Sequence, residues 1–386
     1  MDHSYLLTKT CTIGNQYVEM KKKELFYTLA LQSARGIGPV TAKKLLDHFG
    51  TAGAVFKNIK GENPLLRNLA PELLARLQCK ETLLRVEREL NFLDKNNVRA
   101  IGFGDPDYPV KLRHCADAPL LLFQRGNFDI NEKRVISIVG TRMMTSYGAL
   151  FLKEFIRELK PYEPVIVSGL AFGIDICAHE EALRNGIQTI GILGHGLDRI
   201  YPSQHKDIAR KMMQSGGFYT EFWSGSIAEK VNFIKRNRII AGISEATVVV
   251  ESACVGGSLA TARFASSYDR DVLAVPGRTN DRYSEGCNKL IKSNRASMLT
   301  SVSDLEYVLG WSCEKSVSKP IQKTLPFELD HEEKLVFEQL SGSEEKWLDS
   351  IAKECGLGVQ KTVSILLQLE LKGMVSSHSG KRFRAV

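Results

Sequence analysis

The chain has 386 residues, of which 43% are hydrophobic and 25% are charged. This composition is typical of a globular protein with two or three domains and excludes a disordered or fibrous chain. The 52 basic and 44 acidic residues give a formal net charge of +8, and no apolar run reaches the ~20 residues of a membrane-spanning helix. Eight scattered cysteines without a C-x-x-C pair indicate a reducing compartment, so we expect a cytoplasmic protein without disulfides or a structural zinc cluster.

The first hundred residues predict a loose extension over 1–20 and a small helical domain over 21–100. Within that domain, Gly36-Ile37-Gly38 precedes Lys43 and Lys44. The pattern fits a helix-hairpin-helix, in which turn amides and lysines contact a DNA backbone without reading its sequence. It is equally compatible with an ordinary helical hairpin that only packs. A secondary DNA-backbone contact at Gly36, Gly38, Lys43 and Lys44 is therefore a hypothesis.

Residues 101–310 predict an α/β domain. After a strand-like Leu120–Phe123, apolar runs of strand length recur, separated by amphipathic helices, at Val135–Val139, Val165–Val167, Thr189–Leu193, Thr247–Val250 and Val272–Val275. Continuous apolar strands that alternate with helices are buried on both faces. We therefore expect an extended Rossmann-like, doubly wound parallel sheet.

Turns rich in Gly, Ser and Thr follow these strands, at Gly140-Thr141-Arg142, Ser168-Gly169, Gly194–Asp198, Gly256-Gly257-Ser258 and Pro276-Gly277. In a parallel sheet all five turns line one edge, where unhindered amides and the Arg142 guanidinium would suit phosphate oxygens. The alternative is purely structural, because tight turns also require glycine.

The densest cationic run is Lys235-Arg236-Asn237-Arg238, which lies beside Phe233. It suits a groove that follows a nucleic-acid backbone and stacks bases, although a solvated helix face is the alternative. The apolar residues 239–241 anchor the segment, so we expect its cations at the sheet edge, with Arg142 and Arg238 on the same rim.

The sequence lacks the common nucleotide-binding and catalytic motifs. The chain has no G-x-G-x-x-G at the first turn, no G-x-x-x-x-G-K-[ST], no G-x-S-x-G and no H-E-x-x-H. Asp175 and His179 lie four residues apart, but without a third ligand nearby a structural pair is the favoured interpretation. We expect no catalytic residues, no metal and no cofactor.

The C-terminal part predicts a linker over 311–326 and a winged-helix domain over 327–386, with helices at His331–Leu340, Trp347–Glu354 and Val359–Lys372 and a hairpin that turns at Gly380. Residues 325–386 hold 8 basic and 10 acidic residues, so a polyanion is expected on the preceding part of the chain. Whether the winged helix contacts DNA or protein stays open.

With these motifs in this order, the chain resembles the DNA-processing protein A (DprA/Smf) family of bacterial transformation and recombination proteins. The resemblance runs from about Asp105 to Leu299 and rests on Ile138–Arg142, Ser168–Asp175, Gly194–Asp198, Arg236–Gly242, Gly257–Ala262, Val275–Gly277 and Ser284–Asn288.

The resemblance implies a protein that is not an enzyme, binds and protects single-stranded DNA in a positive pocket, helps to load the RecA recombinase, and forms a homodimer through the Rossmann-like domain. By motif matching, the pocket residues are Gly140, Thr141, Arg142, Ser168, Gly169, Phe172, Lys235, Arg236, Asn237, Arg238, Gly257 and Ser258. Phe172 stands where the family commonly has Arg or Lys, so a phosphate contact is lost or replaced by stacking on a base.

Two other functions are alternatives. Gly256–Thr261 resembles nucleotide phosphoribohydrolases, but their catalytic Glu would fall on Phe264. A winged-helix duplex-DNA regulator is the second alternative, and the acidic C-terminal part argues against it.

Overall fold

The computed structural model describes residues 20–34, 36–59, 63, 66, 74–75, 77, 79–312, 329–340, 346–372, 374–378 and 380–385. The chain forms two compact units, Met1–Cys313 and Glu314–Val386. The predicted extension, apart from Met20, and all but the first two residues of the predicted linker lie outside the described residues. In the described ranges, no helix is both long enough and apolar enough to cross a membrane.

The N-terminal helices belong to the first unit. They are the helix over residues 20–33, α2 (Pro39–Phe49), α3 (Ala52–Lys57) and α6 (Lys80–Lys95). Thr51 caps α3 by accepting a hydrogen bond from the Ala54 N–H group. Leu29 and Leu93 share a buried cluster with Phe218 of the sheet. The predicted helical domain therefore packs directly on the α/β domain.

A nine-stranded sheet is the centre of the first unit, in the order β1-β2-β6-β5-β4-β3-β7-β8-β9. Its strands are β1 (Arg99–Gly102), β2 (Leu121–Arg125), β3 (Val135–Val139), β4 (Val165–Ser168), β5 (Thr189–Ile192), β6 (Gly217–Thr220), β7 (Ala246–Val249), β8 (Asp271–Ala274) and β9 (Ser297–Met298). The strands from β6 to β9 run parallel, whereas β1 and β2 form an antiparallel edge. The chain crosses from β3 to β4 on one side and later returns to β7 on the other, so β3 is the switch point.

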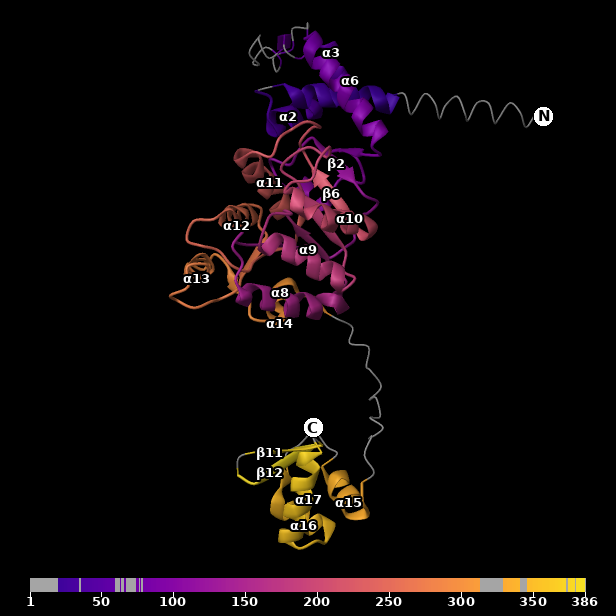
Figure 1. The fold of residues 1–386 in the computed structure, drawn as a ribbon. Coiled ribbons are helices and arrows are strands. Elements are labelled where there is room, and N and C mark those ends of the chain that lie inside the picture. The colour runs from indigo at the N-terminus through magenta and orange to yellow at the C-terminus, as the bar shows by residue number, and fades with distance from the viewer. Residues whose placement is uncertain are drawn as a thin grey trace, which may run out of the picture. The chain divides into compact units, whose positions relative to one another are not determined.

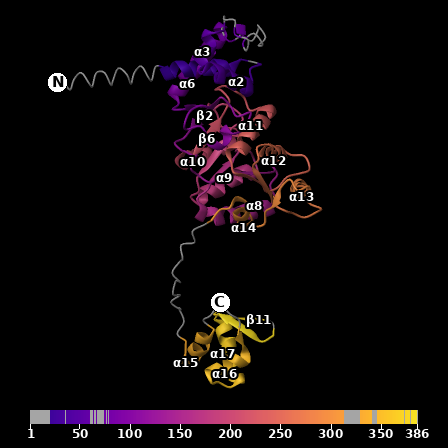
Figure 2. The same cartoon turned by 180° about the vertical axis from the view of Figure 1, so that it is seen from behind.

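Helices cover both faces of the sheet (Figures 1 and 2). One face carries α8 (Ser146–Leu159), η1 (Lys160–Tyr162), α9 (Ile174–Arg184), η2 (Ser203–His205), α10 (Lys206–Ser215) and α14 (Val302–Leu309). The other carries α7 (Val110–Arg113), α11 (Lys230–Ile243), α12 (Gly257–Ser267) and α13 (Glu285–Lys292). The predicted doubly wound parallel sheet is confirmed.

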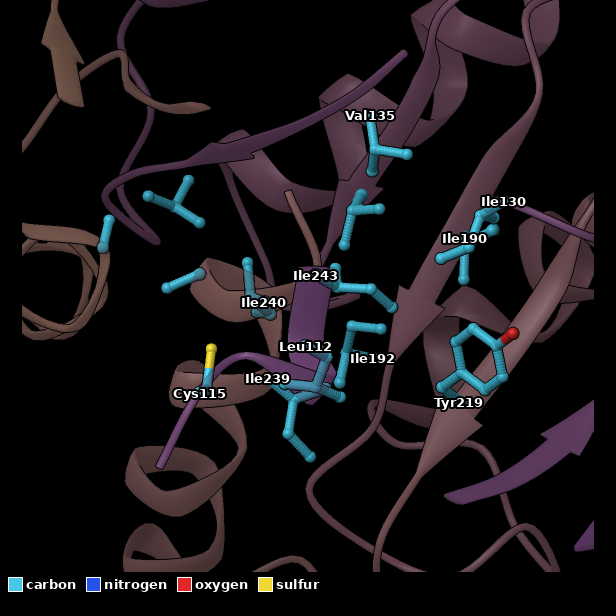
Figure 3. Packing of buried hydrophobic residues seen from close by; sticks show 14 of the residues in the cluster. Leu112, Cys115, Ile130, Val135, Ile190, Ile192, Tyr219, Ile239, Ile240 and Ile243 are labelled. Atoms are coloured by element: carbon cyan, nitrogen blue, oxygen red, sulfur yellow. The ribbon is translucent and has the colours of Figure 1, made fainter. Parts of the chain in front are cut away.

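Helix α11 is anchored by its C-terminal half. Ile239, Ile240 and Ile243 pack with Leu112 and Ile192 in a core that Figure 3 shows between helix and sheet. All five side chains are almost completely buried, and each such side chain stabilises the fold by about 1.5–3 kcal/mol. This fixes the rotation of α11 and therefore the direction in which its cationic residues point.

The second unit is a winged helix. It contains α15 (His331–Gln339), β10 (Lys346–Trp347), α16 (Leu348–Cys355), α17 (Val359–Leu371), β11 (Val375–His378) and β12 (Arg382–Ala385). Its three strands pair in the order β10-β12-β11. Gly380 has a φ of 85° in the hairpin turn, a conformation that glycine adopts without strain. The predicted winged helix is thus confirmed, and β10 is an addition that the sequence analysis missed.

Candidate nucleic-acid interface

A cavity of about 790 Å³ opens where β3, β4 and β7 end, between α11 and α12. It is lined by the turns after these strands, by Tyr201 and by one face of each of the two helices. We call it the strand-end cavity. Its position is the one that ligands occupy in open parallel α/β sheets.

The lining of the strand-end cavity is strongly positive. Its charged residues are Arg142, Lys230, Arg236 and Arg263, against the single carboxylate of Asp175. Arg142, Lys230 and Arg263 are exposed and come from three different elements, the β3–α8 turn, α11 and α12. Three exposed cations around one hollow suit an extended polyanion better than a single compact ion.

Aromatic rings lie among these cations. The Arg142 guanidinium carbon is 5.7 Å from the centre of the Phe233 ring, and the Tyr201 and Phe233 ring centres are 5.8 Å apart. Tyr201 is 47% exposed. An accessible aromatic surface beside arginine offers a nucleobase a stacking partner and its phosphate a cation.

The N-terminus of α12 adds backbone donors. Gly256 precedes the helix, and no side chain caps its first turn. At Gly257 a Cβ would have no neighbour within 4 Å, so a ligand can approach the backbone closely. The first N–H groups of a helix lack intrahelical partners and attract anions.

Beneath the cavity, Arg236 is a structural residue. It is buried and donates hydrogen bonds to the carbonyls of Gly169 and Ile192. Asp175 lies beside it and accepts from the N–H groups of Ala171 and Gly169. Burial lowers the pKa of Arg236 to about 10. Burial also raises the pKa of Asp175, and the positive charge of the Arg236 guanidinium opposes that increase. This pair joins the β4–α9 turn to α11, so it holds the cavity in shape.

The structure gathers part of the predicted site. Gly140, Thr141, Arg142, Arg236, Asn237, Gly257 and Ser258 line the strand-end cavity. The Thr141 N–H group already donates to the Glu251 carbonyl, with 2.7 Å between nitrogen and oxygen. The amide cradle expected at the first turn is therefore not fully available to a ligand.

Three other predicted residues lie apart from the cavity lining. The buried Ser168 hydroxyl donates to the Ile138 carbonyl at 2.6 Å. Gly169 has no space for a side chain, because a Cβ there would collide with Arg236 and Asp175. The Phe172 ring, 42% exposed, packs edge-on against His205 with 4.8 Å between centres. Stacking of Phe172 on a base stays a prediction.

The expectation that Arg142 and Arg238 share one rim is wrong. Lys235 and Arg238 line a different cavity, on another face of α11. The Arg238 guanidinium is ion-paired with Glu221 and donates to the Asp117 carbonyl. Residues two apart on a helix point in different directions, so the run 235–238 divides between two cavities.

In the predicted helix-hairpin-helix, only some residues face solvent. Gly36, with a φ of 103°, and Gly38 are exposed, as is Lys44. Lys43 instead donates to the carbonyls of Cys115 and Ala116, and its ammonium lies 4.2 Å from the Phe103 ring centre. Burial lowers its pKa. This lysine is engaged within the fold, which leaves less charge for a DNA backbone.

Lys230, Tyr201 and Arg263 line the cavity but were not predicted from the sequence. Lys230 and Phe233 lie three residues apart on α11, and Asn237 follows four later, which is the spacing of one helix face. That periodicity was available in the sequence, whereas the contributions of Tyr201 and Arg263 depend on how the chain folds.

No three His, Cys, Asp or Glu side chains in the described ranges are grouped so that they could hold a metal ion. The buried His179 ring bonds through Nδ1 to the Thr189 hydroxyl, 2.7 Å away, rather than forming a ligand pair with Asp175.

The comparisons with known proteins agree with this geometry. The family model "DNA recombination-mediator protein A" matches residues 99–309, and "DprA winged helix domain" matches residues 320–381. The chain therefore belongs to the DNA recombination-mediator protein A family, and the resemblance drawn from its motifs is confirmed.

Individual relatives extend the match. "Protein Smf" of Escherichia coli strain K12 is 34% identical over 308 residues, which cover 76% of this chain and 79% of the relative. The X-ray structure of DNA processing protein A from Streptococcus pneumoniae has a TM-score of 0.58 and 31% identity, covering 73% of this chain and 97% of that one. DNA processing protein A from Helicobacter pylori, described with a unique single-stranded DNA binding mode, has a TM-score of 0.50 and 27% identity, covering 55% of this chain and 95% of that one.

Proposed function

We propose that this protein is a DNA-processing protein that binds single-stranded DNA in the strand-end cavity and acts as a recombination mediator. The observation that carries the proposal is the grouping of exposed Arg142, Lys230 and Arg263 around the Phe233 and Tyr201 rings. Arginine and lysine neutralise phosphates, and aromatic faces take unpaired bases.

Single strands suit this cavity better than duplexes. The aromatic rings lie within a hollow between α11 and α12, where a base can stack only if it is not paired within a double helix. Recognition through stacking and phosphates is tolerant of sequence and requires neither a metal nor a nucleotide cofactor. The Helicobacter pylori relative, which binds single-stranded DNA, supports the same assignment.

The finer role is a proposal that the family resemblance supports. We propose that the bound strand is protected and handed to the RecA recombinase, and that two copies of the chain associate through their Rossmann-like domains. In this role the protein binds without catalysing a reaction. The predicted DNA contacts of Lys235, Arg238, Gly36, Gly38, Lys43 and Lys44 remain part of the proposal, outside the strand-end cavity.

Substitution of the exposed cations tests the site. Arg142→Ala and Lys230→Ala are each expected to weaken the binding of a fluorescent oligothymidine roughly tenfold, about 1.4 kcal/mol, because each removes a phosphate contact. Each should also reduce the slope of log K against log salt by about 0.7. Fluorescence anisotropy over a salt series measures both quantities.

Arg157→Ala is the matched control, because Arg157 is exposed in the last turn of α8 and lies outside the cavity lining. It should bind like the unmodified protein. A preference for duplex over single strands, or unchanged affinity in the Arg142 and Lys230 variants, would contradict the proposed function.

A further inference from the structure

We propose that a second cavity on another face of α11 is a nucleobase-binding subsite for the same DNA strand. This inference rests on the proposed function and extends it. The cavity has a volume of about 920 Å³ and lies between the N-terminal helices, the β6–α11 loop and α11. We call it the helix-side cavity.

Its charges are balanced, unlike those of the strand-end cavity. Arg85, Lys235 and Arg238 face Glu81, Asp117 and Glu221. A lining of three cations and three carboxylates does not favour a row of phosphates inside the cavity. It suits a neutral group with hydrogen-bonding edges, with the phosphates left at the exposed Arg85 and Lys235.

A buried oxygen of a residue that lines this cavity lacks a partner. Glu221 pairs with Arg238 through Oε2, while its Oε1 is buried without any hydrogen bond. Burying such an oxygen is unfavourable unless a donor reaches it. Every nucleobase carries an N–H donor on its pairing edge, whereas phosphodiesters carry none. A base in the cavity would therefore bring a donor next to Glu221, and a phosphodiester would not.

Burial also raises the pKa of Glu221, and the positive charges of Arg238 and then Lys235 oppose that effect. An N–H donor on Oε1 would further favour the ionised carboxylate.

The walls are apolar and aromatic. Phe222, Phe264 and Ile234 line the cavity together with Trp223, whose ring centre lies 5.6 Å from the Arg85 guanidinium carbon. Phe222 and Phe264 are half-buried, so part of each ring remains accessible. Such rings offer a stacking surface to a base.

The two cavities adjoin along α11. Ile234 lines both of them and is 45% exposed, and Lys235 follows directly at the mouth of the helix-side cavity. An α-helix is ~10 Å wide, so a strand that leaves Phe233 and crosses Ile234 needs only a few nucleotides to reach Glu221. This adjacency favours the same strand over an unrelated peptide ligand.

Cross-linking locates the bases. Oligothymidines that carry 5-iodouracil at one position each are bound to the full-length protein and irradiated, and the cross-linked peptides are identified by mass spectrometry. We expect one group of positions to label Phe233 or Tyr201, and positions a few nucleotides away to label Phe222 or Phe264. Labelling confined to Phe233 and Tyr201 at every position would overturn the subsite.

Affinity against strand length gives the second measurement. Lys235→Ala and the conservative Phe264→Leu should each weaken the binding of long strands about tenfold and leave the shortest bound strands unaffected. Lys153→Ala, which removes an exposed lysine from α8, is the matched control. If these two variants weaken binding equally at every strand length, or do not weaken it at all, the subsite is contradicted. If Arg142→Ala also leaves the affinity unchanged and no position cross-links to Phe233, the proposed function is contradicted together with the subsite.

Discussion

His179 is the clearest case of a side chain whose chemistry is set by burial. It is fully enclosed, with Nδ1 bonded to Thr189 and Nε2 without a hydrogen bond. Desolvation, followed by the positive charges of His205 and Arg236, lowers its pKa from 6.5 to about 3. The folded protein therefore holds this imidazole neutral under conditions in which the unfolded chain protonates it.

This difference predicts a loss of stability in acid. The folded-state pKa lies below the unfolded one, so the contribution of His179 is complete above pH 6.5 and is lost as the pH falls towards 3. Between pH 7 and pH 5 the loss is about 2 kcal/mol. Urea unfolding at both pH values measures it.

His179→Asn keeps a polar atom near Thr189 and removes the titration. Its free energy of unfolding should fall less than that of the unmodified protein over the same pH interval. His114→Asn, at an exposed position, is the control and should retain the full pH dependence. Identical pH dependence in the His179 variant would refute the assignment.

At this scale the sequence identified residue types better than residue roles. Arg142 was predicted as a cation at the end of β3, and it lines the cavity. Arg236 and Arg238 belong to the same cationic run, yet both are buried and engaged with Asp175 or Glu221. Their partners are distant in sequence, so only the fold determines which arginine faces solvent and which serves the core.

At the scale of elements, α11 organises the molecule because it packs on the sheet and borders both cavities. Gly242 allows its close approach to α7, since a Cβ at this position would lie 2.8 Å from Cys115 Sγ and from Leu112 Cδ1. Two helices can approach closely where a side chain is missing, and added volume in a tightly packed core is costly.

Gly242→Ala is therefore expected to destabilise the protein by about 1–3 kcal/mol, although alanine ordinarily stabilises a helix by about 1 kcal/mol relative to glycine. Gly257→Ala is the matched control, because its Cβ would have no neighbour within 4 Å. Thermal unfolding compares the two. If combination with Cys115→Ala restores no stability to the Gly242 variant, close packing is not the cause.

In the same helix, the helical period predicts the positions of the charged residues better than their number does. A count of charges treats residues 235–238 as one patch, whereas the 3.6-residue period separates Lys230, Phe233 and Asn237 from Lys235 and Arg238. The division between two cavities was thus partly predictable. The identity of the second cavity was not, because α6 and the β6–α11 loop complete it through tertiary packing.

At the scale of the molecule, the strand pattern sufficed for the fold class. The buried apolar runs predicted β2, β3, β4, β5, β7 and β8, while β1, β6 and β9 were missed. β6 begins at Gly217, directly after Gly216, so it looks like a turn, and β9 has only two residues. Such strands form because the neighbouring strands offer them hydrogen bonds, which no local pattern encodes.

The division into two units leads to a prediction about DNA binding. The strand-end cavity and the helix-side cavity both lie within Met1–Cys313, and so do the core clusters that support them. In the winged helix, Lys361 and Lys372 are already ion-paired with Glu332 and Glu333. The exposed face of α17 carries apolar side chains at Val363, Leu367 and Leu371, which do not attract phosphates.

Deletion of residues 314–386 should therefore leave the affinity for single-stranded oligothymidine within about threefold of the full chain, since this segment holds 11 basic and 11 acidic residues and its loss removes no net positive charge. Anisotropy titration of both proteins measures this, and thermal unfolding of the shortened chain verifies that it folds. Arg142→Ala in the shortened chain is the control and should weaken binding roughly tenfold, as in the full chain. If the shortened chain folds but its affinity falls more than tenfold, essential DNA contacts lie on the winged helix, because both cavities are intact in the shortened chain.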